Sequence, residues 1–157
     1  MNIRLILVGK TEAAYLKAGI QEYSSRLVHY CKFSILEIPE LKNAKSLTRE
    51  QIKEKEGELI LKNISQGDEV ILLDERGKEF TSVEWAQHLE KKFLYSPRDI
   101  NFVIGGSYGF SKGVYARATE MVSLSRMTFS HQLCRVIFLE QLYRLFTIIK
   151  GEPYHHE

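Results

Sequence analysis

Five short apolar runs, separated by stretches with helical periodicity, constrain the fold of this chain more than any other feature. The runs cover residues 3–8, 33–38, 70–73, 100–104 and 121–124. Continuous apolar runs of this length are typical of strands buried on both faces, and helices between successive strands imply parallel crossovers. We therefore predict an α/β fold in which a parallel sheet carries helices on both faces.

Local signals mark where the intervening helices begin and end. Thr48 with Gln51 and Thr81 with Glu84 have the spacing of a capping box. Residues 74–78 have the composition of a turn that follows the third strand. The other predicted helix ends are N-caps at Thr11 and Ser111 and C-caps at Gly67 and Gly151.

Composition limits the class of protein. A chain of 157 residues with 44% hydrophobic residues has enough apolar material for one packed domain. A net charge of +2 permits a polyanionic partner but does not argue for one. Cys31 and Cys134 lack metal-binding spacing, which favours buried free thiols in a reducing compartment. The run 3–8 is too short for a signal peptide or a membrane span, so we expect a soluble cytoplasmic protein that binds neither membrane nor metal.

Ligands of parallel α/β sheets bind in loops at the carboxyl ends of the strands. One such loop, Gly105-Gly106-x-x-Gly109, directly follows the fourth apolar run. It fits neither a P-loop nor a dinucleotide fingerprint, and taken alone a glycine-rich turn without a ligand is the commoner case. The loop Ser125–His131 follows the fifth run and could be an ordinary strand-to-helix connection. Two irregular loops at one sheet edge nevertheless favour a small-molecule pocket.

The last third of the chain combines an apolar helix with an unusual tail. The predicted helix 132–150 is apolar nearly all round, which favours burial against a partner subunit. Glu140 and Arg144 lie on its remaining polar face, either as a simple ion pair or, if a ligand or a dimer buries them, as functional groups. The tail 153–157 contains Pro, Tyr and two His, although a short terminus would ordinarily fray.

Nine short motifs in order carry a resemblance to a known family. They are Val8-Gly9-Lys10, Glu22-Tyr23-x-x-Arg26, Lys55-Glu56-Gly57, Leu73-Asp74-x-x-Gly77-Lys78, Ile104-Gly105-Gly106-x-x-Gly109, Leu124-Ser125-x-Met127-Thr128, His131-Gln132-x-x-Arg135, Glu140-Gln141-x-Tyr143-Arg144 and Pro153-Tyr154-His155. Along essentially its whole length, the chain resembles the ribosomal large-subunit methyltransferase H family of the SPOUT superfamily.

The resemblance implies a fold, a reaction and a cofactor. The implied fold is the SPOUT-type α/β knot, a single domain over residues 1–157 with a mostly parallel five- to six-stranded sheet and a C-terminal trefoil knot. The implied reaction uses S-adenosyl-L-methionine to methylate N3 of a pseudouridine in the helix 69 region of 23S rRNA, on the assembled ribosome and as a homodimer. The implied cofactor positions are Leu73, Gly105, Leu124, Ser125, Arg126, Met127, Thr128 and Phe129.

Several residues in the matched motifs are candidates for the chemistry and for RNA binding. The catalytic candidates are Tyr154, His155, Glu140 and Arg144, and the RNA-binding candidates are His131, Arg135 and His156. An arginine cannot act as a base, but it can stabilise an imide anion or hold a phosphate. We expect the tail of one subunit to complete the pocket of the other.

The chain departs from the family pattern at two positions, and two other functions stay open. Ser130 replaces the usual proline before His131, and His156 replaces a lysine or arginine, which makes that charge titratable. The alternatives are a non-catalytic RNA-binding dimer and an enzyme of another class that binds a nucleotide at its glycine loop.

Overall fold

The computed structural model describes residues 1–156, so Glu157 of the predicted tail lies outside the described part. The strands are β1 (Asn2–Val8), β2 (Lys32–Ile38), β3 (Glu69–Glu79), β4 (Ile100–Ile104) and β5 (Glu120–Ser123). The α-helices are α1 (Ala14–Leu27), α2 (Arg49–Lys62), α3 (Ser82–Tyr95), α4 (Lys112–Arg117) and α5 (His131–Lys150), with a short 3-10 helix at Ala44–Ser46.

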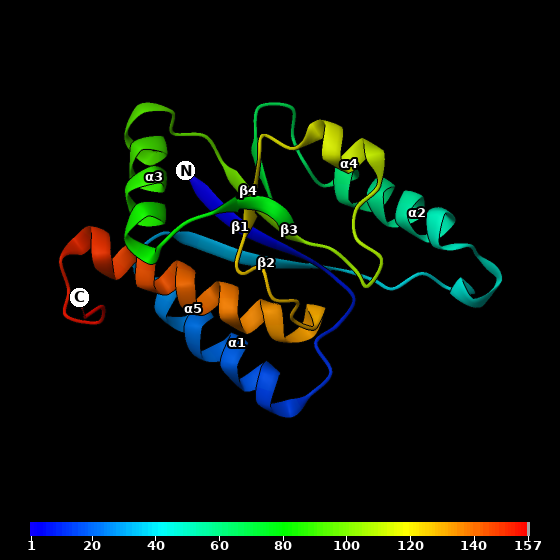
Figure 1. Cartoon of the computed structure of the whole chain (residues 1–157), viewed down its shortest axis with the longest axis horizontal. Coiled ribbons are helices and arrows are strands. Elements are labelled where there is room, and N and C mark those ends of the chain that lie inside the picture. The colour runs from blue at the N-terminus through cyan, green and yellow to red at the C-terminus, as the bar shows by residue number, and fades with distance from the viewer. Residues whose placement is uncertain (157) are drawn as a thin grey trace.

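The five strands form one sheet in the order β2-β1-β4-β3-β5, and every described pairing between them is parallel. Helices α1, α3 and α5 cover one face, and α2 and α4 cover the other (Figure 1). The predicted α/β fold is therefore confirmed. Because all strands point the same way, the loops that follow β1, β4 and β5 meet at one edge of the sheet.

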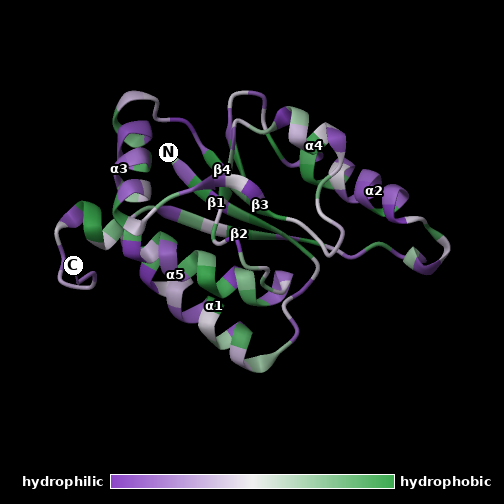
Figure 2. Ribbon diagram, in the orientation of Figure 1, coloured by the Kyte–Doolittle hydropathy of each residue, from purple (hydrophilic) through white to green (hydrophobic). Residues whose placement is uncertain are grey.

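Each face of the sheet has its own apolar core. In β1, Leu5 and Leu7 pack toward α1, α3 and α5, whereas Ile6 and Val8 pack toward α2 and α4. Burial on both faces explains the apolar runs of the central strands β1, β3 and β4, whereas the edge strand β2 contains Ser34 and Glu37 and is largely not buried. In Figure 2, α5 is rich in hydrophobic residues and α2 is mostly hydrophilic. This difference is consistent with the position of α5 between α1, α3 and the sheet.

Most of the predicted helix ends are confirmed. Both capping boxes form, Ser111 accepts a hydrogen bond from the Val114 amide, and Gly151 ends α5 at φ +70°. The prediction for Thr11 is wrong, because α1 is preceded by Ala13 and the Thr11 hydroxyl instead accepts from Arg135. The prediction for Gly67 is also wrong, since α2 ends at Lys62 with Asn63 as its cap.

The turn predicted over residues 74–78 is a bulge inside a longer strand. β3 continues to Glu79, and both Leu73 and Lys78 lie opposite Val122 of β5, so the intervening residues bulge out of the ladder. A Cβ on Gly77 would lie 2.6 Å from backbone atoms of Met121 and Val122. Only glycine therefore lets β3 and β5 approach this closely.

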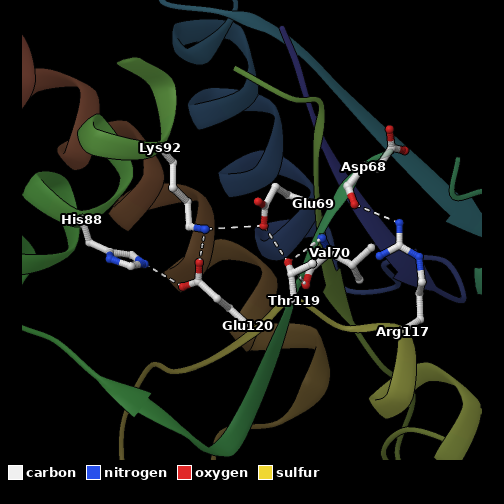
Figure 3. Close-up of polar contacts among 8 residues, drawn as sticks. All are labelled: Asp68, Glu69, Val70, His88, Lys92, Arg117, Thr119 and Glu120. Atoms are coloured by element: carbon white, nitrogen blue, oxygen red, sulfur yellow. Dashed lines mark hydrogen bonds and ion pairs between the residues drawn. The ribbon is translucent and has the colours of Figure 1, made fainter. Parts of the chain in front are cut away.

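Charged side chains anchor the start of β5 at the opposite edge of the sheet (Figure 3). Lys92 Nζ of α3 lies 2.5 Å from the Glu120 carboxylate of β5 and 3.4 Å from the Glu69 carboxylate of β3. His88 Nε2 lies 2.7 Å from Glu120, and the Thr119 hydroxyl donates to Glu69 at 2.7 Å. This network fixes a four-residue strand whose far end leads directly into the loop before α5.

Candidate active site

A cavity of about 710 Å³ opens at the carboxyl edge of the sheet. Three loops form its walls, namely residues 73–76 in the β3 bulge, residues 104–110 after β4 and residues 123–131 after β5. Tyr115 of α4 and Cys134 of α5 complete the lining. A cavity of this volume is typical of a site for a cofactor or another small molecule.

The glycine loop forms one wall largely from backbone. Gly109 has φ +85°, in the left-handed region that favours glycine, and its amide donates to the Gly106 carbonyl at 3.2 Å. A Cβ on Gly105 would lie 3.0 Å from the buried Phe110 ring. The core therefore packs directly against the Gly105 backbone, and a larger side chain at this position has to displace that ring or enter the cavity.

The loop after β5 is ordered by its own side chains. The Ser123 hydroxyl donates to the Ser125 carbonyl at 2.8 Å, and the Ser125 hydroxyl accepts from the Met127 amide at 2.9 Å. Thr128 reaches across the cavity to Glu75 in the β3 bulge, at 3.4 Å. These contacts hold two walls of the cavity together without regular secondary structure.

All but one of the cofactor positions implied by the resemblance lie in the cavity lining. Arg126 is the exception, because its side chain is 88% exposed and lies 3.7 Å from Glu79. The structure brings together Leu73, Gly105, Leu124, Ser125, Met127, Thr128 and Phe129.

A polar group that the sequence analysis missed lies in the same cavity. The Tyr115 hydroxyl donates to the Asp74 carboxylate and accepts from Arg76 Nη2 at 2.5 Å. Burial, together with the hydrogen bond to Asp74, raises the pKa of Tyr115, so its hydroxyl stays protonated at neutral pH. No motif joined these residues in the sequence, because the bulge and α4 meet only in the folded chain.

The catalytic candidates form a second cluster, at the other end of α5. Arg144 Nη2 donates to Glu140 Oε1 at 2.6 Å, and the Tyr154 hydroxyl donates to the same oxygen at 3.1 Å. Arg144 Nη1 lies 3.1 Å from His155 Nδ1. Because an arginine can only donate, His155 Nδ1 is the acceptor. The described tail is thus folded onto α5 rather than frayed, and His156 is exposed.

Burial changes the acid–base behaviour of this cluster. Burial, followed by the nearby Glu140 charge, raises the pKa of Tyr154 well above its ordinary value. Tyr154 is therefore a hydrogen-bond donor at neutral pH and not a ready base. The Glu140 and Arg144 side chains are only 20% and 25% exposed, so their pair is more than an ordinary surface ion pair.

One chain does not bring the tail cluster and the cavity together. His131, at the first turn of α5, lines the cavity, whereas Arg144 lies thirteen residues further along the helix. At the rise of an α-helix this separation is about 20 Å. Figure 1 likewise shows the C-terminus at the opposite end of α5 from the loops of the cavity.

The RNA-binding candidates differ in accessibility. His131 is half-buried at the cavity. Arg135 is completely buried, and its guanidinium donates to the Val8 carbonyl at 2.7 Å and to the Thr11 hydroxyl at 2.9 Å. Its placement in this chain leaves no guanidinium surface for a phosphate and favours a structural role.

Both cysteines are free and half-buried. Burial raises the pKa of Cys31 and of Cys134 to about 11, so both stay as thiols at neutral pH. Cys134 therefore contributes to the cavity as a small apolar group rather than as a nucleophile. Within residues 1–156, no three or more His, Cys, Asp or Glu side chains are grouped to hold a metal ion. The same residues include no helix with the length and apolar character that a membrane span requires.

Comparison with known proteins assigns the chain to a family. A family model described as a predicted SPOUT methyltransferase matches residues 1–155. The chain belongs to the SPOUT methyltransferases. Its relatives include proteins named ribosomal RNA large subunit methyltransferase H from Parabacteroides distasonis, at 55% identity, and from Flavobacterium johnsoniae, at 53% identity. Each of these alignments covers 100% of both chains.

The family assignment confirms the resemblance and the type of fold. A putative methyltransferase from Legionella pneumophila, solved with bound SAM, aligns with 95% of this SPOUT methyltransferase and 66% of its own chain. At 13% identity and a TM-score of 0.48, that likeness is too distant to carry a conclusion about the site. The trefoil knot stays a prediction of the resemblance.

Proposed function

We propose that residues 1–157 form a single methyltransferase domain that methylates N3 of a pseudouridine in the helix 69 region of 23S rRNA. In this proposal the protein uses S-adenosyl-L-methionine, works as a homodimer in the cytoplasm and acts on the assembled ribosome. The observation that carries it is the cavity. Its walls contain nearly all the cofactor positions of the family, in a chain that aligns end to end with proteins named for this activity.

The cavity suits a sulfonium nucleotide. The cofactor supplies an electrophilic methyl group on a positively charged sulfur. Asp74 and Glu75 bring two carboxylates to the lining and Arg76 brings one cation, so the β3 bulge has a net negative charge that favours a cationic ligand. The glycine loop and the loop after β5 offer backbone groups that can hydrogen-bond adenine and ribose. Positioning and exclusion of water are then the main tasks of the chain.

The tail cluster supplies groups for the target base. The imide proton has to leave N3, and the charge left behind has to be stabilised. We propose that the Arg144 guanidinium, which always donates hydrogen bonds, stabilises the imide anion. Nδ1 of His155 accepts the proton that leaves N3. These two groups contact each other in the free chain, so substrate binding has to separate them. Tyr154 is protonated and serves as a donor that holds Glu140 in place.

Two subunits are needed to build the complete site. The tail cluster and the cavity of one chain lie about 20 Å apart along α5. The tail of one subunit reaching the cavity of its partner resolves this separation. Exposed apolar side chains near the cavity offer contact area for a partner, namely Met127, 76% exposed, and Leu133 on α5, 37% exposed.

The decisive test is mass spectrometry of 23S rRNA from cells that lack this protein. We expect one pseudouridine to lose its methyl group and to regain it when the purified protein and S-adenosyl-L-methionine are added to the ribosomes. Methylation that is unchanged in these cells would contradict the proposal.

Cofactor binding provides an independent check. At a hundredfold excess over Kd, S-adenosyl-L-methionine should stabilise the fold by about 2.7 kcal/mol. Equal stabilisation by ATP or NAD would instead support a nucleotide enzyme of another class. Salt-dependent RNA binding with no cofactor effect would support a non-catalytic RNA-binding dimer.

A further inference from the structure

The loop between β1 and α1 is held from behind by a buried arginine. Arg135 of α5 donates one hydrogen bond to the Val8 carbonyl at the end of β1 and another to the Thr11 hydroxyl in the loop. No carboxylate among residues 1–156 lies within ion-pair distance of its guanidinium, although Glu37 and Glu40 act on it from further away. Burying a charge without an ion-pair partner is unfavourable. The hydrogen bonds from Arg135 to Val8 and Thr11 offset part of this cost, and they hold the loop in place.

A second side chain from the same turn of α5 fixes the loop further along. The Gln132 side chain donates to the Lys10 carbonyl at 3.0 Å and accepts from the Glu12 amide at 3.1 Å. At the other end of the loop, the Gly9 amide donates to the Ile38 carbonyl at 2.7 Å. Surface loops are usually mobile, whereas the backbones of Gly9, Lys10 and Glu12 are each hydrogen-bonded to another element.

The clamped loop lies beside the cavity. β1 pairs with β4, which leads into the glycine loop, so the two loops leave neighbouring strands at the same edge of the sheet. Gln132 and Arg135, the two α5 residues that clamp the loop, each directly follow a residue that lines the cavity, His131 and Cys134 respectively. The loop therefore leaves the same sheet edge as the cavity, although none of residues 9–12 lines the cavity itself.

The loop presents one exposed cation, Lys10, next to a carboxylate, since a Cβ on Gly9 would lie 2.9 Å from Glu40 Oε1. Lys10 is exposed, and among residues 1–156 no carboxylate lies within 4.0 Å of its ammonium group. Its backbone is held by a hydrogen bond, because its carbonyl accepts from the Gln132 side chain. A cation on a fixed backbone loses less conformational entropy when it binds an anion than one on a flexible loop does.

We propose that the β1–α1 loop is a contact for the RNA backbone, in which Lys10 binds a phosphate and Gln132 and Arg135 are positioning residues. This inference rests on the proposed function, since it takes the RNA substrate from there. Phosphate contacts of this kind set the register of a nucleic acid without reading its sequence. Arg135 then promotes RNA binding from beneath the loop and never touches the RNA.

The test compares Lys10→Ala with Lys17→Ala, which removes another exposed lysine, on α1. Ribosomes from cells lacking the protein serve as substrate, and three quantities are measured: ribosome affinity across a salt series, KM and kcat for methylation, and Kd for S-adenosyl-L-methionine. We expect Lys10→Ala to raise KM for ribosomes about tenfold and to reduce the slope of log affinity against log salt by about one. The cofactor Kd and the behaviour of Lys17→Ala should match the wild type.

A second variant separates positioning from direct contact. Gln132→Ala should raise KM for ribosomes by a smaller factor with an unchanged cofactor Kd, and adding it to Lys10→Ala should cause no further loss, because Gln132 acts through Lys10. An unchanged salt slope in Lys10→Ala, or a weakened cofactor Kd, would overturn the inference. Wild-type protein that fails to methylate these ribosomes would instead refute the proposed function.

Discussion

Replacing Lys92 by methionine tests how β5 is anchored. Its ammonium group lies between the carboxylates of Glu120 and Glu69, and the three side chains are 20%, 21% and 12% exposed (Figure 3). Methionine keeps most of the length and volume of the side chain but removes the charge. The two carboxylates then remain near each other, mostly buried and without their shared cation.

The expected loss of stability lies between the limits for exposed and buried ion pairs. Breaking an exposed pair costs up to about 1 kcal/mol, and removing one partner of a fully buried pair costs about 3–5 kcal/mol. The solvent that still reaches Lys92 and Glu120 screens part of the interaction, and His88 stays in contact with Glu120. We therefore expect a loss of about 2–3 kcal/mol, which corresponds to a Tm lower by about 4–12 °C in a chain of this size.

The assay is urea unfolding of a double-mutant cycle that combines Lys92→Met with Glu120→Gln. The coupling energy should be about 1–2 kcal/mol. Lys53→Met is the matched control, because its partner Glu50 is 74% exposed and their separation is 2.7 Å. The control should change stability by less than about 0.5 kcal/mol. A coupling energy near zero, or a control as damaging as Lys92→Met, would refute the reasoning.

The same network predicts a pH dependence with a definite sign. Burial alone would raise the pKa of Glu69, but the hydrogen bond from Thr119 and the charge of Lys92 outweigh it, and the pKa is lowered. A lowered carboxyl pKa contributes stability above the unfolded value of about 4.3, and that contribution is lost as pH falls through the folded pKa. Lys92→Met should therefore weaken the loss of stability below pH 4.3 in acid titrations of the unfolding free energy.

Three further predictions concern the cavity, the tail and the β3 bulge. Gly105→Val should weaken S-adenosyl-L-methionine binding at least a hundredfold in calorimetry while costing about 1–3 kcal/mol of stability, because it crowds the Phe110 ring; wild-type affinity would contradict this. Deleting residues 154–157 should keep cofactor binding and abolish transfer of a labelled methyl group to ribosomes; full activity would exclude the tail. Gly77→Ala should destabilise the protein by about 3 kcal/mol in urea, whereas Gly67→Ala, which meets nothing within 4 Å, should change stability by less than about 1 kcal/mol; equal effects would contradict the proposed close approach of β3 and β5.

The sequence predicted the order and the type of the elements because the strands are short apolar runs, which in β1, β3 and β4 reflects burial on both faces. It failed where pairing in three dimensions overrides local preference. Residues 74–78 have the composition of a turn, and residues 74–77 do leave the ladder, but Lys78 and Glu79 pair with β5 again. Neither residue carries a local signal of that pairing.

Site residues were predictable where the site consists of contiguous loops. The cavity walls follow strand ends, so motif and topology pointed to them together. Arg135, an RNA-binding candidate from its motif, is completely buried in this chain. The helical period does place it on the same face as Phe138, Leu139 and Leu142, all of which are buried, and this spacing was available in the sequence. The pairing of Asp74 with Tyr115 had no such signal, because 41 residues separate them.

The contacts between the C-terminal tail and α5 determine at which stage the tail loses its conformational freedom. Tyr154 and His155 already lie against Arg144 and Glu140 in the isolated chain, so their rotamer freedom is lost during folding. A terminus that became ordered only on the ribosome would subtract that entropy from the affinity for RNA. A tail that is already folded onto α5 avoids this loss of entropy when it binds.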